Sequence, residues 1–407
     1  MRKRETKNLK REPANSPAPR PALRTPCLIA RALLDWFAVN ARDLPWRRTR
    51  DPYAIWASEI MLQQTQVKTV IPYWERWMRE LPTLQSLAEA KPDTIHKLWE
   101  GLGYYTRVRN LQKAAQQICA NHGGEFPREF DAILALPGIG RYTAGAIASI
   151  AFNQPAPILD GNVIRVLCRL HGIAEDPQEK RTNARLWQLA GELASAAATL
   201  TQHALRKTTG EITRQSKPKI NKGSDLPTAL PCSALNQSLM ELGALICTPR
   251  TPSCGVCPVA KHCVARRENR VDALPRPKQR AAVTERGFMV FLVEQRGRFL
   301  VQQRGANVVN AHLWEFPNLE ANGKADVVEL AQLEFGAKPT ATQPLCTIKH
   351  AITRYRITAE AYRVEFGAQR IEGGKNRRWC RHDELARLAF TSAHRRIADK
   401  LRGQPCG

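Results

Sequence analysis

The hydrophobic pattern divides the chain into a long region of helical periodicity and a shorter region of strand-like runs. Apolar residues recur at helical spacing in segments between residues 28 and 198, and again over 235–246. Later, β-branched and aromatic runs predict strands at Phe288–Glu294, Phe299–Gln303, Thr347–Ile352 and Tyr355–Val364, with helices near Val327–Glu334 and His394–Leu401. We therefore predict a mostly α-helical region followed by an α+β domain.

Within the helical region, the pattern predicts helices at 28–40, 84–97 and 111–121. Ser58 is a good N-cap for a helix that would run through Glu59 to Val67. On such a helix Glu59, Gln63 and Gln66 would share one face. An acid beside two amides suits base reading, whereas the helix alone favours a solvated polar face.

A Pro-Gly-x-Gly break separates two helical runs at Leu136–Gly140 and predicts a tight hairpin. Gly138 and Gly140 can take positive φ and leave backbone N–H groups exposed, and the next helix begins near Arg141. Such a hairpin grips a phosphate. Asp160, which precedes another helix, is by itself more often an N-cap. A phosphate grip beside a carboxylate nevertheless suggests chemistry on a nucleic acid backbone or sugar.

A second glycine-rich turn, Gly101-Leu102-Gly103-Tyr104-Tyr105, leads to Arg107. Glycines beside an exposed tyrosine would let an aromatic side chain enter a base stack. A plain turn between helices, with both tyrosines in the core, fits the same residues.

Length and charge narrow the class of partner. The chain has 407 residues, enough for two or three domains, and a formal net charge of +25 from 62 basic and 37 acidic residues. This excess favours a nucleic acid partner first and an anionic membrane surface second. We find no apolar run of about 18 residues and therefore expect no membrane span.

Three segments lack the pattern of a packed core. Residues 1–27 form a basic, proline-broken arm without the apolar core of a secretory signal, residues 201–231 a flexible basic insertion, and residues 268–285 a charged linker. We therefore expect domains at 28–267 and 286–402, in a cytoplasmic protein associated with the nucleoid.

The cysteines supply the strongest single signal. Seven of the eleven are scattered, which fits a reducing cytosol, and four form the run Cys247, Cys254, Cys257 and Cys263. Four thiolates within 17 residues can enclose a zinc ion or an iron–sulfur cluster. Zinc prefers two short Cys-x2-4-Cys pairs, so the longer loops here favour the cluster.

Taken together, these motifs resemble the adenine DNA glycosylases of base-excision repair, in the helix–hairpin–helix superfamily. The pieces that carry the resemblance, across about residues 28–265, are Leu44-Pro45-Trp46-Arg47, Ser58–Val67, Gly101–Tyr105, Leu136–Gly140, Leu159-Asp160-Gly161-Asn162-Val163 and the cysteine run. The resemblance implies a glycosylase domain with a [4Fe-4S] cluster and, as partner, double-stranded DNA with adenine opposite 8-oxoguanine or guanine. We expect a monomer without a membrane partner.

The resemblance also assigns roles to residues. Adenine would be flipped out of the duplex; Glu59 would protonate its ring nitrogen and then help to activate water. Asp160 would stabilise the oxocarbenium-like sugar. Gln63, Gln64 and Tyr104 would contact DNA, the last two at the gap left by the flipped base.

Tyr142 separates the two nearest reaction types. Endonuclease-III-type enzymes carry a lysine at this place, which forms a Schiff base and cuts the strand. Tyrosine cannot form an imine, so we predict a monofunctional glycosylase in which Tyr142 hydrogen-bonds near Asp160.

The carboxy-terminal domain resembles the Nudix-like domain that senses 8-oxoguanine in this family, through Leu313–Pro317 and Ser392–Arg395. The glutamates of a Nudix hydrolase are missing around Gly323 to Gly336, which disfavours catalysis there. The family's lesion-sensing Phe-Ser-His aligns with Ile352-Thr353-Arg354, where Thr353 would supply the hydroxyl.

Three other functions compete with this one. A bifunctional pyrimidine-lesion glycosylase is disfavoured by Tyr142 and the added domain, and a nucleotide-pool hydrolase by the missing glutamates. A non-enzymatic DNA-binding protein would need neither Glu59 nor Asp160.

Overall fold

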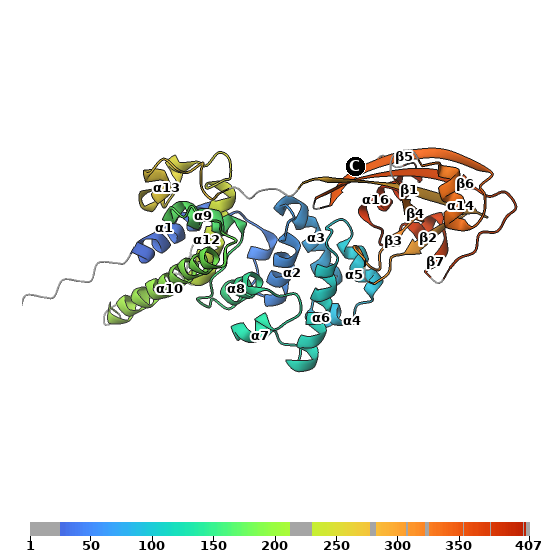
Figure 1. Cartoon of the computed structure of the whole chain (residues 1–407). Coiled ribbons are helices and arrows are strands. Elements are labelled where there is room, and N and C mark those ends of the chain that lie inside the picture. The colour runs from blue at the N-terminus through green and yellow to red at the C-terminus, as the bar shows by residue number, and fades with distance from the viewer. Residues whose placement is uncertain are drawn as a thin grey trace, which may run out of the picture.

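The computed structural model describes residues 25–211, 230–276, 282–306, 308–321, 325–352, 354–374, 376–401 and 403. A group of helices lies beside a sheet domain (Figure 1). Within the described residues, no helix is both long and apolar enough to cross a bilayer. The predictions for residues 1–24 and 212–229, which cover most of the arm and insertion, lie outside the described residues.

The helical region begins at Thr25 and ends near Arg267. Its helices are α1 (Thr25–Asn40), η1 (Pro45–Arg47), α2 (Pro52–Leu62), α3 (Val67–Glu80), α4 (Leu84–Glu89), α5 (Pro92–Trp99), α6 (Thr106–Asn121), α7 (Phe130–Leu134), α8 (Arg141–Ile150), α9 (Gly161–His171), α10 (Lys180–Glu211), α12 (Pro231–Leu245), η2 (Cys254–Val256), η3 (Ala260–His262) and α13 (Val264–Arg267). The predicted helices at 28–40 and 111–121 are confirmed.

The predicted N-cap at Ser58 is wrong. Helix α2 begins at Pro52, capped by the Asp51 side chain, and Ser58 is buried within it. The helix ends at Leu62 because Gln63 leaves helical geometry and Gln64 takes a left-handed φ of 58°. Glu59, Gln63 and Gln66 therefore do not share a helix face.

Two other helix boundaries differ from prediction. The run at 84–97 is two helices, since α4 ends before Ala90 and Lys91 caps α5 in extended geometry. Helix α10 continues to Glu211, inside the segment predicted as a flexible insertion. The next described helix, α12, already begins at Pro231.

Close backbone contacts fix the elements around Asp160. A Cβ on Gly145 of α8 would lie 2.1 Å from the carbonyl oxygen of Pro157, and one on Gly243 of α12 would lie 2.6 Å from Cβ of Asn162. Glycine is thus required where α8 and α12 approach the chain on either side of Asp160. These contacts place the segment before Asp160 against α8 and the start of α9 against α12.

The predicted hairpin between α7 and α8 is present. Gly138 has a φ of 76°, and a Cβ there would meet Cβ of Asn110 at 2.6 Å. Gly140 has an ordinary φ of −94° and is the N-cap of α8. The left-handed prediction therefore holds for Gly138 and is wrong for Gly140.

The second domain contains one seven-stranded sheet of order β3-β2-β1-β6-β5, with β4 on β1 and β7 on β2. Its elements are β1 (Thr284–Gln295), β2 (Arg298–Gln303), β3 (Trp314–Glu315), β4 (Asn318–Glu320), α14 (Val327–Phe335), β5 (Ala341–Ile352), β6 (Tyr355–Glu365), β7 (Arg377–Arg381), α15 (His382–Leu385) and α16 (Ser392–Leu401). The predicted strands and helices are confirmed; β1 starts earlier, inside the predicted linker.

Candidate active site

The helical region encloses a cavity of about 520 Å³ between α2, α8, α12 and the start of α9. Its lining brings together the three predicted catalytic residues, Glu59, Tyr142 and Asp160, with Gln63 and Gln64. A cavity of this size suits a small organic group such as a nucleobase.

Glu59 lies on α2 and is 5% exposed. Burial is the main cause that raises its pKa to about 7, and the nearby charge of Asp160 raises it too. A hydrogen bond from Tyr142 and the charge of Arg47 act in the opposite direction without restoring the usual value. A carboxyl group with this pKa exchanges its proton near neutral pH, as a general acid requires.

The hydroxyl of Tyr142, on α8, donates a hydrogen bond to Oε2 of Glu59 at 2.7 Å. The hydroxyl oxygen also lies 3.3 Å from Sδ of Met240. The hydrogen bond that we predicted near Asp160 is therefore made to Glu59, in the cavity that Asp160 also lines. Burial raises the pKa of Tyr142 well above its usual value, so the phenol stays protonated and donates. This bond occupies one carboxyl oxygen of Glu59 and leaves Oε1 to carry the proton.

Asp160 is the N-cap of α9, as the simpler interpretation of the sequence expected. Its Oδ1 accepts the N–H of Val163 at 2.8 Å, and its Oδ2 accepts Nδ2 of Asn162 at 3.0 Å. It still lines the cavity. The cap and the catalytic role are therefore compatible, because the cap fixes the carboxylate at the cavity wall.

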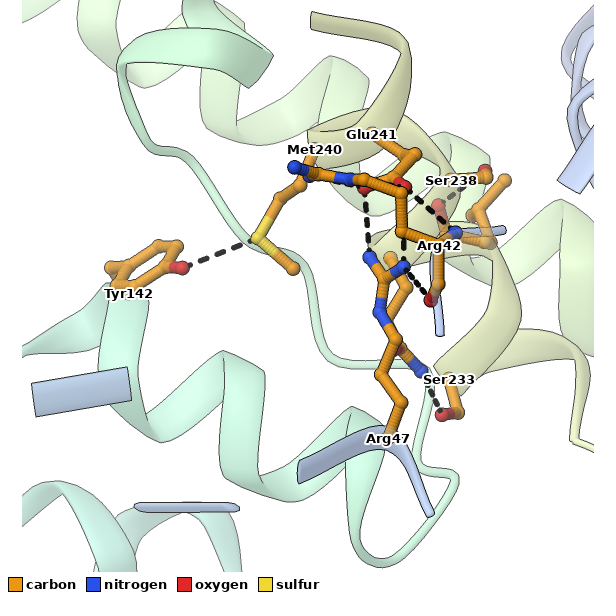
Figure 2. A network of polar contacts seen from close by, with 9 residues as sticks. Arg42, Arg47, Tyr142, Ser233, Ser238, Met240 and Glu241 are labelled. Carbon is orange, nitrogen blue, oxygen red and sulfur yellow. Dashed lines mark hydrogen bonds and ion pairs between the residues drawn. The ribbon is translucent and has the colours of Figure 1, made fainter. Parts of the chain in front are cut away.

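A charged network that the sequence did not predict forms another wall. Glu241 of α12 is buried; Arg42 donates to it through Nε at 2.8 Å and Nη2 at 2.7 Å, and Arg47 through Nη2 at 3.0 Å (Figure 2). Burial alone would raise the pKa of Glu241, but these arginines hold it at about 2. Arg47 belongs to the Leu44-Pro45-Trp46-Arg47 motif. No motif near Glu241 indicated its role, because its partner Arg42 lies almost 200 residues away in the sequence.

Of the predicted DNA contacts that the structure describes, Gln63 and Gln64 line this cavity, whereas Tyr104, Gly138 and Gly140 do not. Tyr104 is 48% exposed at the turn before α6, with a φ of 49°. Gly138 lines a separate cavity of about 90 Å³ that also touches Gln63. Gly140 lies at the start of α8. Thr353 is outside the described residues, so its predicted role stays a prediction.

The four cysteines of the predicted metal site line one small cavity together with Arg169 of α9. Arg169 is buried, and its Nη1 lies 3.4 Å from Sγ of Cys247 and donates to the carbonyl of Thr248 at 2.7 Å. Across the described residues, no three His, Cys, Asp or Glu side chains are arranged for a single metal ion. The convergence of four thiols on a cavity with a cationic neighbour fits an anionic iron–sulfur cluster.

The second domain shows why its helix α14 does not resemble a metal-binding Nudix helix. Of its two glutamates, Glu329 is exposed, and Glu334 forms an ion pair with Arg377 of β7. Burial raises the pKa of Glu334 although Arg377 opposes this effect. The carboxylates of this helix are thus one exposed and one paired with an arginine.

Comparisons with known proteins agree with this geometry. Residues 57–192 match the HhH-GPD superfamily of base excision DNA repair proteins, 247–263 the iron–sulfur binding domain of endonuclease III, and 289–400 the NUDIX domain. The chain is 34% identical to an adenine DNA glycosylase of Rattus norvegicus, over 90% of this chain and 76% of that protein. It is 32% identical to the Homo sapiens adenine DNA glycosylase, over 92% and 74%.

Among solved structures, a thermostable thymine-DNA glycosylase is 27% identical with a TM-score of 0.47, covering 60% of this chain and 97% of that one. The two sequence matches, which cover 90% or more of this chain, and the three domain matches, in the order that the structure shows, decide the family. The chain belongs to the adenine DNA glycosylase family.

Proposed function

We propose that this enzyme, an adenine DNA glycosylase of base-excision repair with a [4Fe-4S] cluster, acts on adenine mispaired with 8-oxoguanine or guanine after flipping the adenine into the 520 Å³ cavity. The observation that carries the proposal is the position of Glu59, with its pKa of about 7, in the cavity that Asp160 also lines. A base stacked within a DNA duplex can reach both carboxyl groups only after it has been flipped out of the duplex.

In the proposed mechanism, Glu59 transfers its proton from Oε1 to a ring nitrogen of adenine. The bond between the base and C1′ of the sugar breaks, and its electron pair leaves with the neutral base. Asp160, fixed by its two donors, stabilises the positive charge that develops on the sugar. Glu59, now a carboxylate, accepts a proton from the water that adds to C1′.

The cluster supplies no step of this chemistry. Cys247, Cys254, Cys257 and Cys263 would hold it, and Arg169 lies beside it. Bound there, the cluster would fix a loop that carries Lys261, Arg266 and Arg267, whose charges suit DNA phosphates.

Tyr142 supports a monofunctional reaction. Its phenol is committed to Glu59, and tyrosine offers no amine for a Schiff base with C1′. We expect base release without strand cleavage, in a monomeric protein of the cytoplasm.

Single-turnover assays on duplexes with adenine opposite 8-oxoguanine, guanine or thymine, and on thymine glycol, test the proposal. Adenine should be released only from the first two duplexes, with strand breaks appearing after alkali. Efficient borohydride trapping, or equal release opposite thymine, would contradict it. Thr353→Ala should reduce the preference for 8-oxoguanine over guanine.

A further inference from the structure

We propose that the Nudix-like domain braces the turn that carries Tyr104, through an ion pair between Arg395 of α16 and Glu100 at the end of α5. Both are positioning residues for base flipping, and the proposal rests on the function proposed above. The domains meet at this point, where α5 lies at the border with the sheet domain (Figure 1).

The contact is formed by a partly buried carboxylate with both oxygens hydrogen-bonded. Oε1 of Glu100 accepts Nε of Arg395 at 2.8 Å and the backbone N–H of Phe390 at 2.9 Å. Oε2 accepts Nζ of Lys97 at 2.6 Å. The side chains of Glu100 and Arg395 are only 14% and 15% exposed, so solvent screens this pair less than a surface ion pair.

Arg395 is itself fixed by its own domain. One of its guanidinium nitrogens donates to the carbonyl of Leu388, and its guanidinium lies 5.0 Å from the ring centroid of Phe390. Nζ of Lys97 reaches the same Leu388 carbonyl from the helical region, at 3.3 Å. The ion pair therefore joins the end of α5 to α16 and to the segment that precedes it in the second domain.

Apolar contact surrounds these charges. Leu313 and Ala389 of the second domain are buried in the same core cluster as residues of the helical region such as Trp99. Nη1 of Arg109, on α6, also donates to the carbonyl of Ala311 at 3.3 Å. The ion pair between Glu100 and Arg395, called the brace below, thus lies in a packed interface between the two domains.

The turn that follows Glu100 needs support from outside. Gly101, Gly103 and Tyr104 all have positive φ, of 104°, 68° and 49°. A Cβ on Gly101 would lie 2.2 Å from the Tyr73 hydroxyl, which donates to the Glu100 carbonyl at 2.8 Å. A non-glycine residue in this region is strained and persists only where its surroundings determine it.

The same turn is tied to the rim of the catalytic cavity. Nη2 of Arg107 donates to the carbonyls of Leu102 and Gly103 at 2.9 and 3.1 Å. Its Nη1 donates to the carbonyls of Ile60 and Gln63 at 2.6 and 2.7 Å, at the end of α2. A continuous set of polar contacts therefore runs from Arg395 through Glu100 and the turn to the helix of Glu59.

This arrangement gives the second domain a mechanical task in the proposed reaction. Tyr104 must enter the base stack along a defined path while the adenine leaves, and small displacements of positioning groups cost large factors in rate. Loss of the ion pair should slow flipping and leave the proton transfer by Glu59 unchanged.

A double-mutant cycle tests the brace. Glu100→Gln, Arg395→Gln and the double variant are compared with wild type in single-turnover adenine release from the 8-oxoguanine duplex. We expect each single variant to lose about tenfold and the double variant to lose no more than either, as for coupled neighbours. Glu320→Gln, which removes the partner of Arg286 within the second domain, is the control and should be neutral.

Two further readouts separate positioning from general damage. With 2-aminopurine in place of the adenine, the fluorescence rise on mixing should slow in Glu100→Gln and Arg395→Gln, while the midpoint of the pH–rate profile stays that of wild type. Arg395→Lys, which keeps the charge, should recover part of the rate of adenine release. It replaces Arg395→Gln in the test if that variant does not fold.

The outcomes are distinguishable. If wild type releases no adenine from either mispair, the proposed function fails. If wild type is active and the Glu100 and Arg395 variants match Glu320→Gln in rate and flipping, or their losses simply multiply, the brace is refuted.

Discussion

In the helical region, the buried carboxyl of Glu59 receives its hydrogen bond from the neutral phenol of Tyr142. In the Nudix-like domain, Glu334 and Glu315 are instead paired with the guanidinium groups of Arg377 and Arg304. A carboxyl beside a neutral donor can hold a proton near neutral pH, whereas a paired arginine favours the charged carboxylate and opposes the effect of burial. The acid beside Tyr142 thus serves proton transfer, whereas the arginine-paired acids, including Glu241 of the helical region, serve folding.

The largest expected effect comes from removing the proton that Glu59 donates. Glu59→Gln keeps the shape and loses the acid, so single-turnover adenine release should fall about 10⁴-fold. Binding to the duplex, measured by anisotropy, should persist. Release within tenfold of wild type would show that another group protonates the base.

Asp160→Asn tests the second carboxylate of the same cavity. The amide oxygen can still accept the Val163 N–H, so α9 should keep its cap while the negative charge disappears. We expect adenine release to fall about 10³-fold, the size of such charge stabilisation, with only a small drop in melting temperature, from the lost hydrogen bond of Asn162. A large drop in melting temperature would instead mark Asp160 as chiefly structural.

The raised pKa of Glu59 also predicts a cost in stability. Between about pH 4.5 and 7 the folded state keeps a proton that the unfolded chain has lost, so the free energy of unfolding falls as pH rises through this window. Glu59→Gln removes this penalty and should be more stable than wild type by about 3 kcal/mol near pH 8, with no difference near pH 4. Urea unfolding of both proteins at both pH values measures this difference in the free energy of unfolding. If Glu59→Gln were less stable than wild type near pH 8, a buried Glu59 carboxylate would not be costing stability.

The smallest expected effect concerns the glutamates of the Nudix-like domain. With its glutamates exposed or paired, α14 should not bind magnesium, so 8-oxo-dGTP with magnesium should yield no pyrophosphate. Metal-dependent turnover that Glu334→Gln abolishes would mean that the Arg377 pair opens to form a working site.

Local motifs allowed the sequence to predict much of this site. The hairpin and the cysteine run were each expected from contiguous residues, and the roles of Glu59 and Asp160 from the family resemblance; the cavity brings both carboxyl groups together. The sheet strands followed from β-branched runs for the same reason.

What the sequence could not predict depends on distant contacts or on uniform burial. Residues from Tyr53 to Met61 are all buried, so α2 has no polar face to mark its true start, and Ser58 was mistaken for a cap. The partner of Tyr142 and the clamp on Glu241 join residues far apart in the chain. The contact between Glu100 and Arg395 spans almost 300 residues and leaves no local pattern.

The central claim is that Glu59 is a buried acid that carries a proton near neutral pH. It is tested most directly by the single-turnover rate of adenine release from the 8-oxoguanine duplex, measured between about pH 5 and 9. The account predicts a midpoint near 7, with the rate falling tenfold per pH unit above it as Glu59 loses its proton. A rate that stays level or rises through this range would contradict it.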